Sequence, residues 1–214
     1  MKQAAWTQRL KGRFVVFDGP DGSGKSTQFR RFSALCRDGG IEVTEVREPG
    51  GTAIGERIRE VLLDPQCQEM TVRCEMLLFM ASRAQLVERV IRPALEGGHL
   101  VLCDRFVSST LAYQGTAGGL PPAEIRSVAR VAVGNCVPHL TVVFDVDEVT
   151  AASRLSPLLD RMEQKGLEFH RRVRGGYLEQ ARADPSRHLV VDASRPPDEV
   201  FESLVAGVRA AMSG

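Results

Sequence analysis

The segment Gly19 to Ser26, GPDGSGKS, most constrains what this chain can fold into. It satisfies the pattern G-x-x-x-x-G-K-[ST], directly follows the apolar run RFVVF and opens a segment with helical spacing. A loop of this kind turns backbone N–H groups toward a phosphate, and the helix N-terminus adds a partial positive charge. The segment therefore predicts a strand, a phosphate-binding loop (P-loop) and a helix.

The residues of this loop have separate expected roles. Lys25 would add a full positive charge beside the phosphate, and the Ser26 hydroxyl would be placed to ligate Mg²⁺. The other loop positions expected to bind the phosphates of a nucleotide are Gly19, Asp21, Gly22, Ser23, Gly24 and Thr27. A glycine-rich turn without a ligand is the competing interpretation, and the strand and helix on either side argue against it.

Apolar runs of strand length recur along the chain, at 13–18, 41–47, 99–104, 139–146 and 187–193. Buried strands that alternate with helices predict an α/β fold with a parallel sheet covered on both faces. The expected helices span 25–40, 51–65, 72–98, 121–135, 148–184 and 196–212. A bend is expected near Pro93, and Ser156-Pro157 should interrupt the fifth helix with a mobile loop.

Composition excludes several classes of protein. The 214 residues favour one domain, and 28 basic against 27 acidic side chains give no overall field for nucleic acid or an anionic membrane. The five cysteines are scattered without a C-x-x-C pair, which favours a reduced cytoplasmic protein and disfavours a zinc site. Neither a signal peptide nor a stretch of roughly 20 apolar residues for a membrane span is found.

Positions outside the loop separate the classes of P-loop protein. The N-K-x-D motif that reads guanine is missing, which weakens a GTPase interpretation. The third predicted strand ends in Cys103-Asp104-Arg105 and lacks the acidic pair that would supply a water-activating glutamate. The sequence therefore favours transfer of a phosphoryl group to a bound acceptor over hydrolysis.

Several segments together resemble the thymidylate kinase (dTMP kinase) family of P-loop nucleoside monophosphate kinases. They are FDGPDGSGKST, REPGGT (47–52), LLFMASRAQLVERVIRPAL (77–95), CDRFVSSTLAYQG (103–115), DRMEQ (160–164) and VVDASRPPDEV (190–200). The resemblance implies a P-loop NTPase fold with a five-stranded parallel sheet, order 2-3-1-4-5, and a helical lid at about 149–164. It also implies transfer of the γ-phosphoryl of ATP to dTMP, with Mg²⁺, in dTTP biosynthesis by a homodimer.

Phe79 and Arg83 lie four residues apart and therefore on one face of a predicted helix. This spacing would put an aromatic plane beside a fork of hydrogen-bond donors. The resemblance implies that the pair stacks on thymine and binds its exocyclic oxygen. Taken by itself, the helix would suit a core phenylalanine and a solvated arginine better.

Arg105 follows a strand whose carboxyl end should open on the ligand crevice of a parallel sheet. Its guanidinium suits a phosphate, and the resemblance implies that it binds the acceptor's phosphate together with Arg47. The resemblance also places Asp104 near Mg²⁺, and Pro49 would bring the backbone close to the acceptor. The alternative is a surface pair between Asp104 and Arg105.

Four further residues are assigned by resemblance. Tyr113 would pack against the deoxyribose and disfavour a 2′-hydroxyl, and Thr110 and Gln114 would contact the base or the sugar. Asp21 is unusual in a phosphate cradle because like charges repel. In the family this aspartate accepts a hydrogen bond from the acceptor's 3′-hydroxyl, and the alternative is that Asp21 faces solvent and caps the turn.

The expected lid departs from the family pattern. The P-loop contains no arginine, so the lid should supply the cation that stabilises the transferred group, yet it offers only Arg154 and Arg161 as catalytic candidates. A related kinase for another nucleoside monophosphate, or a nucleotide-binding regulatory paralogue with weakened catalysis, is therefore an alternative. Residues 1–12, which include Trp6, match nothing in the family and are expected to be disordered or superficial, outside a kinase domain at 13–214.

Overall fold

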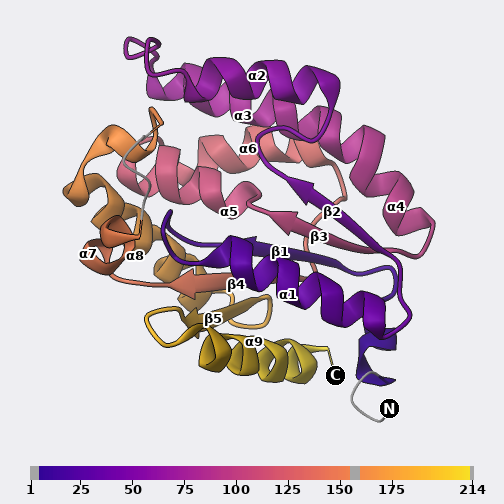
Figure 1. The fold of residues 1–214 in the computed structure, drawn as a ribbon. Coiled ribbons are helices and arrows are strands. Elements are labelled where there is room, and N and C mark those ends of the chain that lie inside the picture. The colour runs from indigo at the N-terminus through magenta and orange to yellow at the C-terminus, as the bar shows by residue number, and fades with distance from the viewer. Residues whose placement is uncertain (1–4, 155–159, 213–214) are drawn as a thin grey trace.

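The structure is a computed structural model that describes residues 5–154 and 160–212. Within these ranges, one parallel sheet has the strand order β2-β3-β1-β4-β5, which confirms the predicted sheet. Its strands are β1 (Phe14–Asp18), β2 (Val43–Arg47), β3 (Leu100–Asp104), β4 (Leu140–Asp145) and β5 (His188–Asp192). The strand arrowheads in Figure 1 all point toward the same side of the sheet, so the carboxyl ends meet there.

Burial along the strands explains the apolar runs in the sequence. Every residue of β1 is buried, and β3 and β4 are buried up to their last residue, because helices cover both faces of the sheet. The edge strands β2 and β5 are mostly half-buried or exposed. The long apolar runs therefore mark the centre of the sheet.

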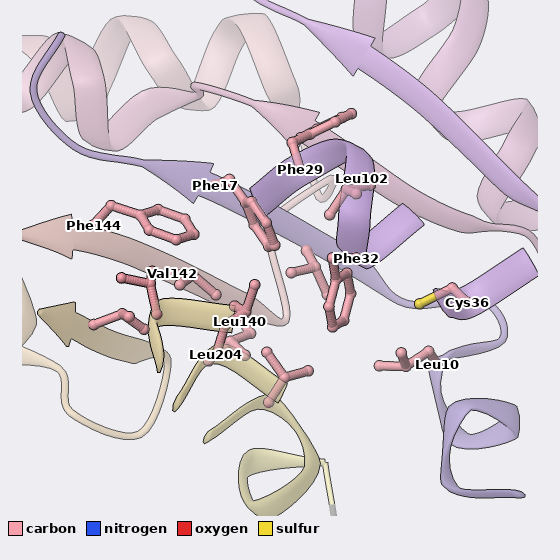
Figure 2. Close-up of a cluster of buried hydrophobic side chains, with 14 of the residues drawn as sticks. Leu10, Phe17, Phe29, Phe32, Cys36, Leu102, Leu140, Val142, Phe144 and Leu204 are labelled. Atoms are coloured by element: carbon pink, nitrogen blue, oxygen red, sulfur yellow. The ribbon is translucent and has the colours of Figure 1, made fainter. Parts of the chain in front are cut away.

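One face of the sheet is covered by η1 (Ala5–Leu10), α1 (Lys25–Asp38) and α9 (Pro197–Ala211). Figure 2 shows Phe17 of β1 between Phe144 of β4 and Phe32 of α1. The Phe17 ring centroid lies 5.6 Å from that of Phe32 and 5.1 Å from that of Phe144. These aromatic contacts fix the helix that follows the P-loop against the central strand.

The N-terminal segment belongs to this same core. Leu10 is fully buried, and Trp6 is 9% exposed with its ring centroid 6.4 Å from that of Phe32. Figure 2 shows Leu10 at the edge of the cluster, beside Cys36 and Phe32. The expectation of a disordered or superficial segment is wrong for residues 5–10, because Trp6 and Leu10 bury their side chains in the core cluster that α1 also joins.

The opposite face is covered by α3 (Val72–Leu86), η2 (Val87–Ile91), α4 (Arg92–Glu96) and α6 (Pro122–Val133), which lie above the sheet in Figure 1. The helix α2 (Ala53–Leu63) packs on α3. Phe14 and Val16 of β1 point into this second cluster. Near Pro93, where a bend is expected, the helix contains the π-helical turn η2, just before the proline. Proline has no N–H for the helical ladder, which is the physical reason for an irregular turn there.

Helical segments after β3 and β4 form a third layer near the carboxyl ends of the strands. They are α5 (Val107–Thr110), η3 (Leu111–Ala117), α7 (Glu148–Ser153), η4 (Glu163–Lys165) and α8 (Leu167–Ala183). A Cβ at Gly176 of α8 would lie 2.7 Å from the Thr116 hydroxyl oxygen, so glycine allows α8 to approach η3 closely. The predicted interruption at Ser156-Pro157 lies outside the described residues.

The cysteines are free thiols: Cys36, Cys103 and Cys136 are buried, and Cys74 is exposed. Among the described residues, no helix has the length and apolar character needed to cross a membrane.

Candidate active site

The P-loop connects β1 to α1 and depends on its glycines. Gly22 has a φ of 74°, in the left-handed region that favours glycine. A Cβ at Gly22 would lie only 2.1 Å from the Ala151 carbonyl oxygen of α7. Gly24 caps α1 without a side chain, so the N-terminus of that helix opens directly onto the loop. This is the geometry expected of an anion-binding cradle.

Lys25 is 7% exposed and folds back over its own loop. Its Nζ donates to the Gly19 carbonyl at 3.1 Å and to the Pro20 carbonyl at 2.9 Å, and it lies 3.5 Å from the Ser23 hydroxyl. Burial, and then the nearby Arg105 guanidinium, lower the pKa of Lys25. The ammonium group is thus placed inside the cradle, where its positive charge would attract an entering phosphate.

A cavity of about 430 Å³ opens over this loop, and we call it the P-loop cavity. Residues 21–27 of the loop and α1 form one side of it. The remaining lining residues come from other elements; they are Arg47, Glu48, Arg59, Asp104, Arg105, Arg154, Asp160 and Glu163. The structure therefore brings the predicted Arg47, Asp104, Arg105 and Arg154 to the phosphate cradle.

The donors around Ser26 fit a divalent cation. Ser26 and Asp104 both line the P-loop cavity, and Asp104 Oδ1 is buried without a hydrogen-bond partner among the described residues. Carboxylate, hydroxyl and phosphate oxygens are the ligands that Mg²⁺ prefers. The described residues contain no group of three or more His, Cys, Asp or Glu side chains that could hold a metal, so phosphates and water would have to supply most of the ligands.

Arg105 adopts a φ of 68° at the end of β3, which turns its side chain across the P-loop. Its guanidinium pairs with Asp21 and contacts four other oxygens, those of the Gly19 carbonyl, Ser109, Tyr113 and Tyr177. Burial would lower the pKa of Arg105, but Asp21 and the neighbouring oxygens outweigh it and raise that pKa. The alternative of an isolated surface pair between Asp104 and Arg105 is therefore wrong.

Asp21 faces the interior of the site. Its carboxylate accepts hydrogen bonds from Arg105 and, at 2.8 Å, from the Tyr113 hydroxyl. Burial alone would raise the pKa of Asp21, but Arg105, Lys25 and the hydrogen bonds lower it to about 2. The repulsion expected of a carboxylate in a phosphate cradle is thus offset within the protein, and the alternative of an outward-facing turn cap is wrong. Its contact with a 3′-hydroxyl stays a prediction.

A buried network behind Arg105 was missed by sequence reasoning. Asp18 is fully buried and accepts hydrogen bonds of 2.6 Å from the Ser109 and Tyr177 hydroxyls. Tyr177 lies on α8 and also accepts a hydrogen bond of 3.1 Å from Arg105. The network ties α8, α5 and the end of β1 together. Tyr177 could not be identified from the sequence, because its partners Arg105 and Asp18 lie 72 and 159 positions away.

A second cavity, of about 110 Å³, lies beside the first, and we call it the inner cavity. It is lined by Asp21, Glu48, Pro49, Arg59, Leu63, Phe79, Arg105, Ser109, Thr110, Tyr113, Gln114, Asp160 and Met162. The two cavities share Asp21, Glu48, Arg59, Arg105 and Asp160. The structure therefore brings together the predicted Pro49, Phe79, Thr110, Tyr113 and Gln114, in a site that adjoins the P-loop.

Arg83 is placed differently from Phe79, although both lie on α3. Arg83 is 1% exposed and donates to Glu48 Oε2 at 2.6 Å, to the Thr110 hydroxyl at 3.1 Å and to the Phe106 carbonyl at 3.0 Å. It therefore supports the wall of the inner cavity from behind. The buried carboxylate of Glu48 engages the Arg83 guanidinium, and the predicted direct contact between Arg83 and a base stays a prediction.

Glu48 and Arg59 line both cavities, and sequence reasoning assigned neither of them a role. Burial raises the pKa of Glu48 to about 7 although Arg83 acts in the opposite direction, and Glu48 Oε1 has no partner among the described residues. Arg59 of α2 donates to the Pro49 carbonyl at 2.9 Å. Glu48 lies within the REPGGT segment and could have been noticed there, whereas Arg59 lies among alternating charges typical of an exposed helix.

The two lid candidates have different surroundings. Arg154 lines the P-loop cavity, and its Nη1 donates to the Ala193 carbonyl at 2.9 Å. Arg161 is 4% exposed, pairs with Glu75 of α3 at 2.6 Å and donates to the Leu62 carbonyl. Arg161 does not line the P-loop cavity in the described structure, and its role as a catalytic cation stays a prediction.

The comparisons with known proteins all indicate the same family. The family model described as thymidylate kinase matches residues 17–204. A thymidylate kinase of Deinococcus radiodurans is 49% identical over 202 residues, which cover 92% of this chain and 97% of the relative. One of Symbiobacterium thermophilum is 50% identical over 192 residues, 89% of this chain and 90% of the relative. The crystal structure of thymidylate kinase from Ehrlichia chaffeensis superposes with a TM-score of 0.75 at 30% identity, covering 92% of this chain and 98% of that one.

Proposed function

The chain belongs to the thymidylate kinase family, and we propose that its two adjoining cavities hold the donor and the acceptor in transfer of the γ-phosphoryl of ATP to dTMP, giving dTDP and ADP. The observation that carries this proposal is the shared wall of the cavities. Asp21 and Arg105 lie on that wall, so a phosphate in either cavity would be near the same charges. Positioning and charge stabilisation supply most of the catalysis in this chemistry.

On the donor side, the P-loop amides and Lys25 hold the ATP phosphates. Arg154 lines the same cavity and is the lid arginine placed to stabilise the transferred group. Its hydrogen bond to Ala193 also connects the lid to the 192–197 segment, which is proposed to lie beside adenine. Ser26 and Asp104 would hold Mg²⁺, whose charge when bound would neutralise part of the charge on the phosphates.

On the acceptor side, Arg105, Arg47 and Arg59 bind the dTMP phosphate. Arg47 pairs with Glu56 at 2.8 Å on the exposed rim and would exchange that partner for the phosphate. The base lies against Phe79, Thr110 and Gln114, and the sugar lies beside Tyr113 and Asp21; the support for this placement is that the five residues line one cavity. Arg83 acts indirectly, through Thr110 and Glu48.

A coupled assay of ADP release with dTMP, dUMP, UMP and thymidine tests activity and acceptor together. We expect dTMP to be preferred, Lys25→Met to abolish transfer, and Lys11→Met, at an exposed site outside both cavities, to leave it unchanged. If Lys25→Met kept the turnover of the wild type, the assignment of this loop as the site for the ATP phosphates would be wrong. Preference for another acceptor would favour a related kinase, and binding of ATP and dTMP without product would favour the regulatory paralogue.

The assembly proposed here is a homodimer formed through α3 and α6. Leu77 on α3 is 49% exposed and Val131 on α6 is 88% exposed, so both helices present apolar side chains to the outside. Sedimentation should give a dimer for the wild type and a monomer for Leu77→Asp. Val137→Asp, a matched change at another exposed site, should remain dimeric. A cytoplasmic location is proposed from the free thiols, which suit a reducing compartment.

A further inference from the structure

Gln114 of η3 and Glu75 of α3 form a buried hydrogen-bonded pair beside the inner cavity. The Gln114 Nε2 group donates to Glu75 Oε1 at 2.7 Å, and each residue is only 1% exposed. Gln114 also lines the inner cavity. One branch of its side-chain amide is therefore bonded to Glu75, and the other is left for whatever occupies the cavity.

The charge on Glu75 is fixed by two further partners. Arg161 lies 2.6 Å and Lys165 lies 3.0 Å from Glu75 Oε2. Burial would raise the pKa of Glu75, but Gln114, Lys165 and Arg161 outweigh it and lower that pKa. Glu75 is therefore a carboxylate at neutral pH, and a carboxylate only accepts hydrogen bonds.

The orientation of the Gln114 amide follows from this charge. Because Glu75 cannot donate, the NH₂ branch of Gln114 must face it, and the carbonyl oxygen Oε1 must lie on the opposite branch. A flip of the amide would place two acceptors against each other in a buried site, which is costly. Gln114 thus presents a hydrogen-bond acceptor, its carbonyl oxygen, to the inner cavity and not a donor.

We propose that Glu75, held by Arg161 and Lys165, is a positioning residue that turns the Gln114 oxygen toward the acceptor base and so selects pyrimidines with an N3–H group. This inference rests on the proposed function, in which the acceptor nucleotide occupies the inner cavity. Thymine and uracil carry a proton at N3 and can donate to Gln114 Oε1. Cytosine has a lone pair at N3, and its approach would put two acceptors in contact.

The test is Glu75→Gln, with kcat/KM measured for dTMP and for dCMP. Arg161 contacts the oxygen that faces away from Gln114, and Lys165 contacts both oxygens, at 3.1 Å and 3.0 Å. Both cations will therefore keep the oxygen of the new amide on the Arg161 side, so its NH₂ group will donate to Gln114 and turn the Gln114 amide around. We expect the ratio of kcat/KM for dTMP over dCMP to fall on the order of 10- to 100-fold, the range for a reversed buried hydrogen bond. The KM for dTMP should rise while that for ATP stays unchanged.

Two further variants keep the result decisive. Glu88→Gln makes the same chemical change at an exposed residue that pairs with Arg92, and its selectivity should equal that of the wild type. Gln114→Met removes the oxygen but leaves Glu75 with both of its cations, so it should fold and lower the ratio even if Glu75→Gln does not fold. Normal dTMP turnover with an unchanged ratio in the folded variants would overturn this inference alone. Wild-type protein without dTMP turnover would overturn the proposed function and this inference with it.

Discussion

Neutralising Glu48 should change how the stability of this protein depends on pH. Burial raises the pKa of Glu48 from 4.5 to about 7 in the folded protein, so the folded state holds this proton more tightly than the unfolded chain does. The stability contributed by the protonated form is therefore present below pH 4.5 and is lost as the pH rises through 7. At 1.36 kcal/mol per pH unit the full effect is about 3 kcal/mol, most of which falls between pH 5 and pH 8.

The assay is urea unfolding of the wild type and of Glu48→Gln at pH 5, 6, 7 and 8. Glutamine resembles the protonated carboxyl group and does not titrate, so the variant should gain about 2–3 kcal/mol of unfolding free energy relative to the wild type across this range. Glu60→Gln, at an exposed position of α2, is the matched control and should show no such trend. A constant difference between Glu48→Gln and the wild type at all four pH values would refute the reasoning.

Three further changes have expected outcomes. Leu10→Ala should lower the unfolding free energy by about 2–5 kcal/mol, because the side chain is fully buried; unchanged urea stability would contradict its place in the core. Gly22→Ala should abolish ATP binding in calorimetry, since its Cβ would meet a backbone oxygen at 2.1 Å, whereas Gly98→Ala, which also has a positive φ but lies in open space, should bind normally. A maleimide should label the exposed Cys74 before Cys36, whose pKa burial raises to about 12, and equal labelling of both would disagree with the structure.

The strands could be predicted from the sequence because their apolar runs have a direct physical cause. Central strands covered on both faces must be apolar throughout, and each predicted run contains the strand that the structure places there. The helical segment 107–117 was not predicted, because its serines, threonines and glycine do not favour a helix in isolation. It depends on packing against α8, where Gly176 permits a close approach that no local pattern reveals.

The active-site residues likewise divide into those that could be predicted from the sequence and those that could not. The P-loop could be predicted because strand, glycines, lysine and helix follow one another along the chain. The sequence predicted Arg83 as a base contact and Arg161 as a lid cation, but their partners in the structure, Glu48 and Glu75, lie 35 and 86 positions away. An ion pair with a buried carboxylate limits which other groups an arginine can contact. Sequence spacing alone does not identify that carboxylate.

Because Asp21 pairs with Arg105, it competes with any anion that could bind this arginine. Any anionic ligand that binds Arg105 must do so against a carboxylate that is already in place and tethered to the same loop. A tethered group has a high effective concentration, so a small anion in solution competes poorly with it. A nucleotide that contacts Arg59 as well as Arg105, and whose sugar and base lie in the inner cavity, has further contacts with which to compete. We therefore expect the pair to weaken the binding of inorganic phosphate more than that of a nucleotide.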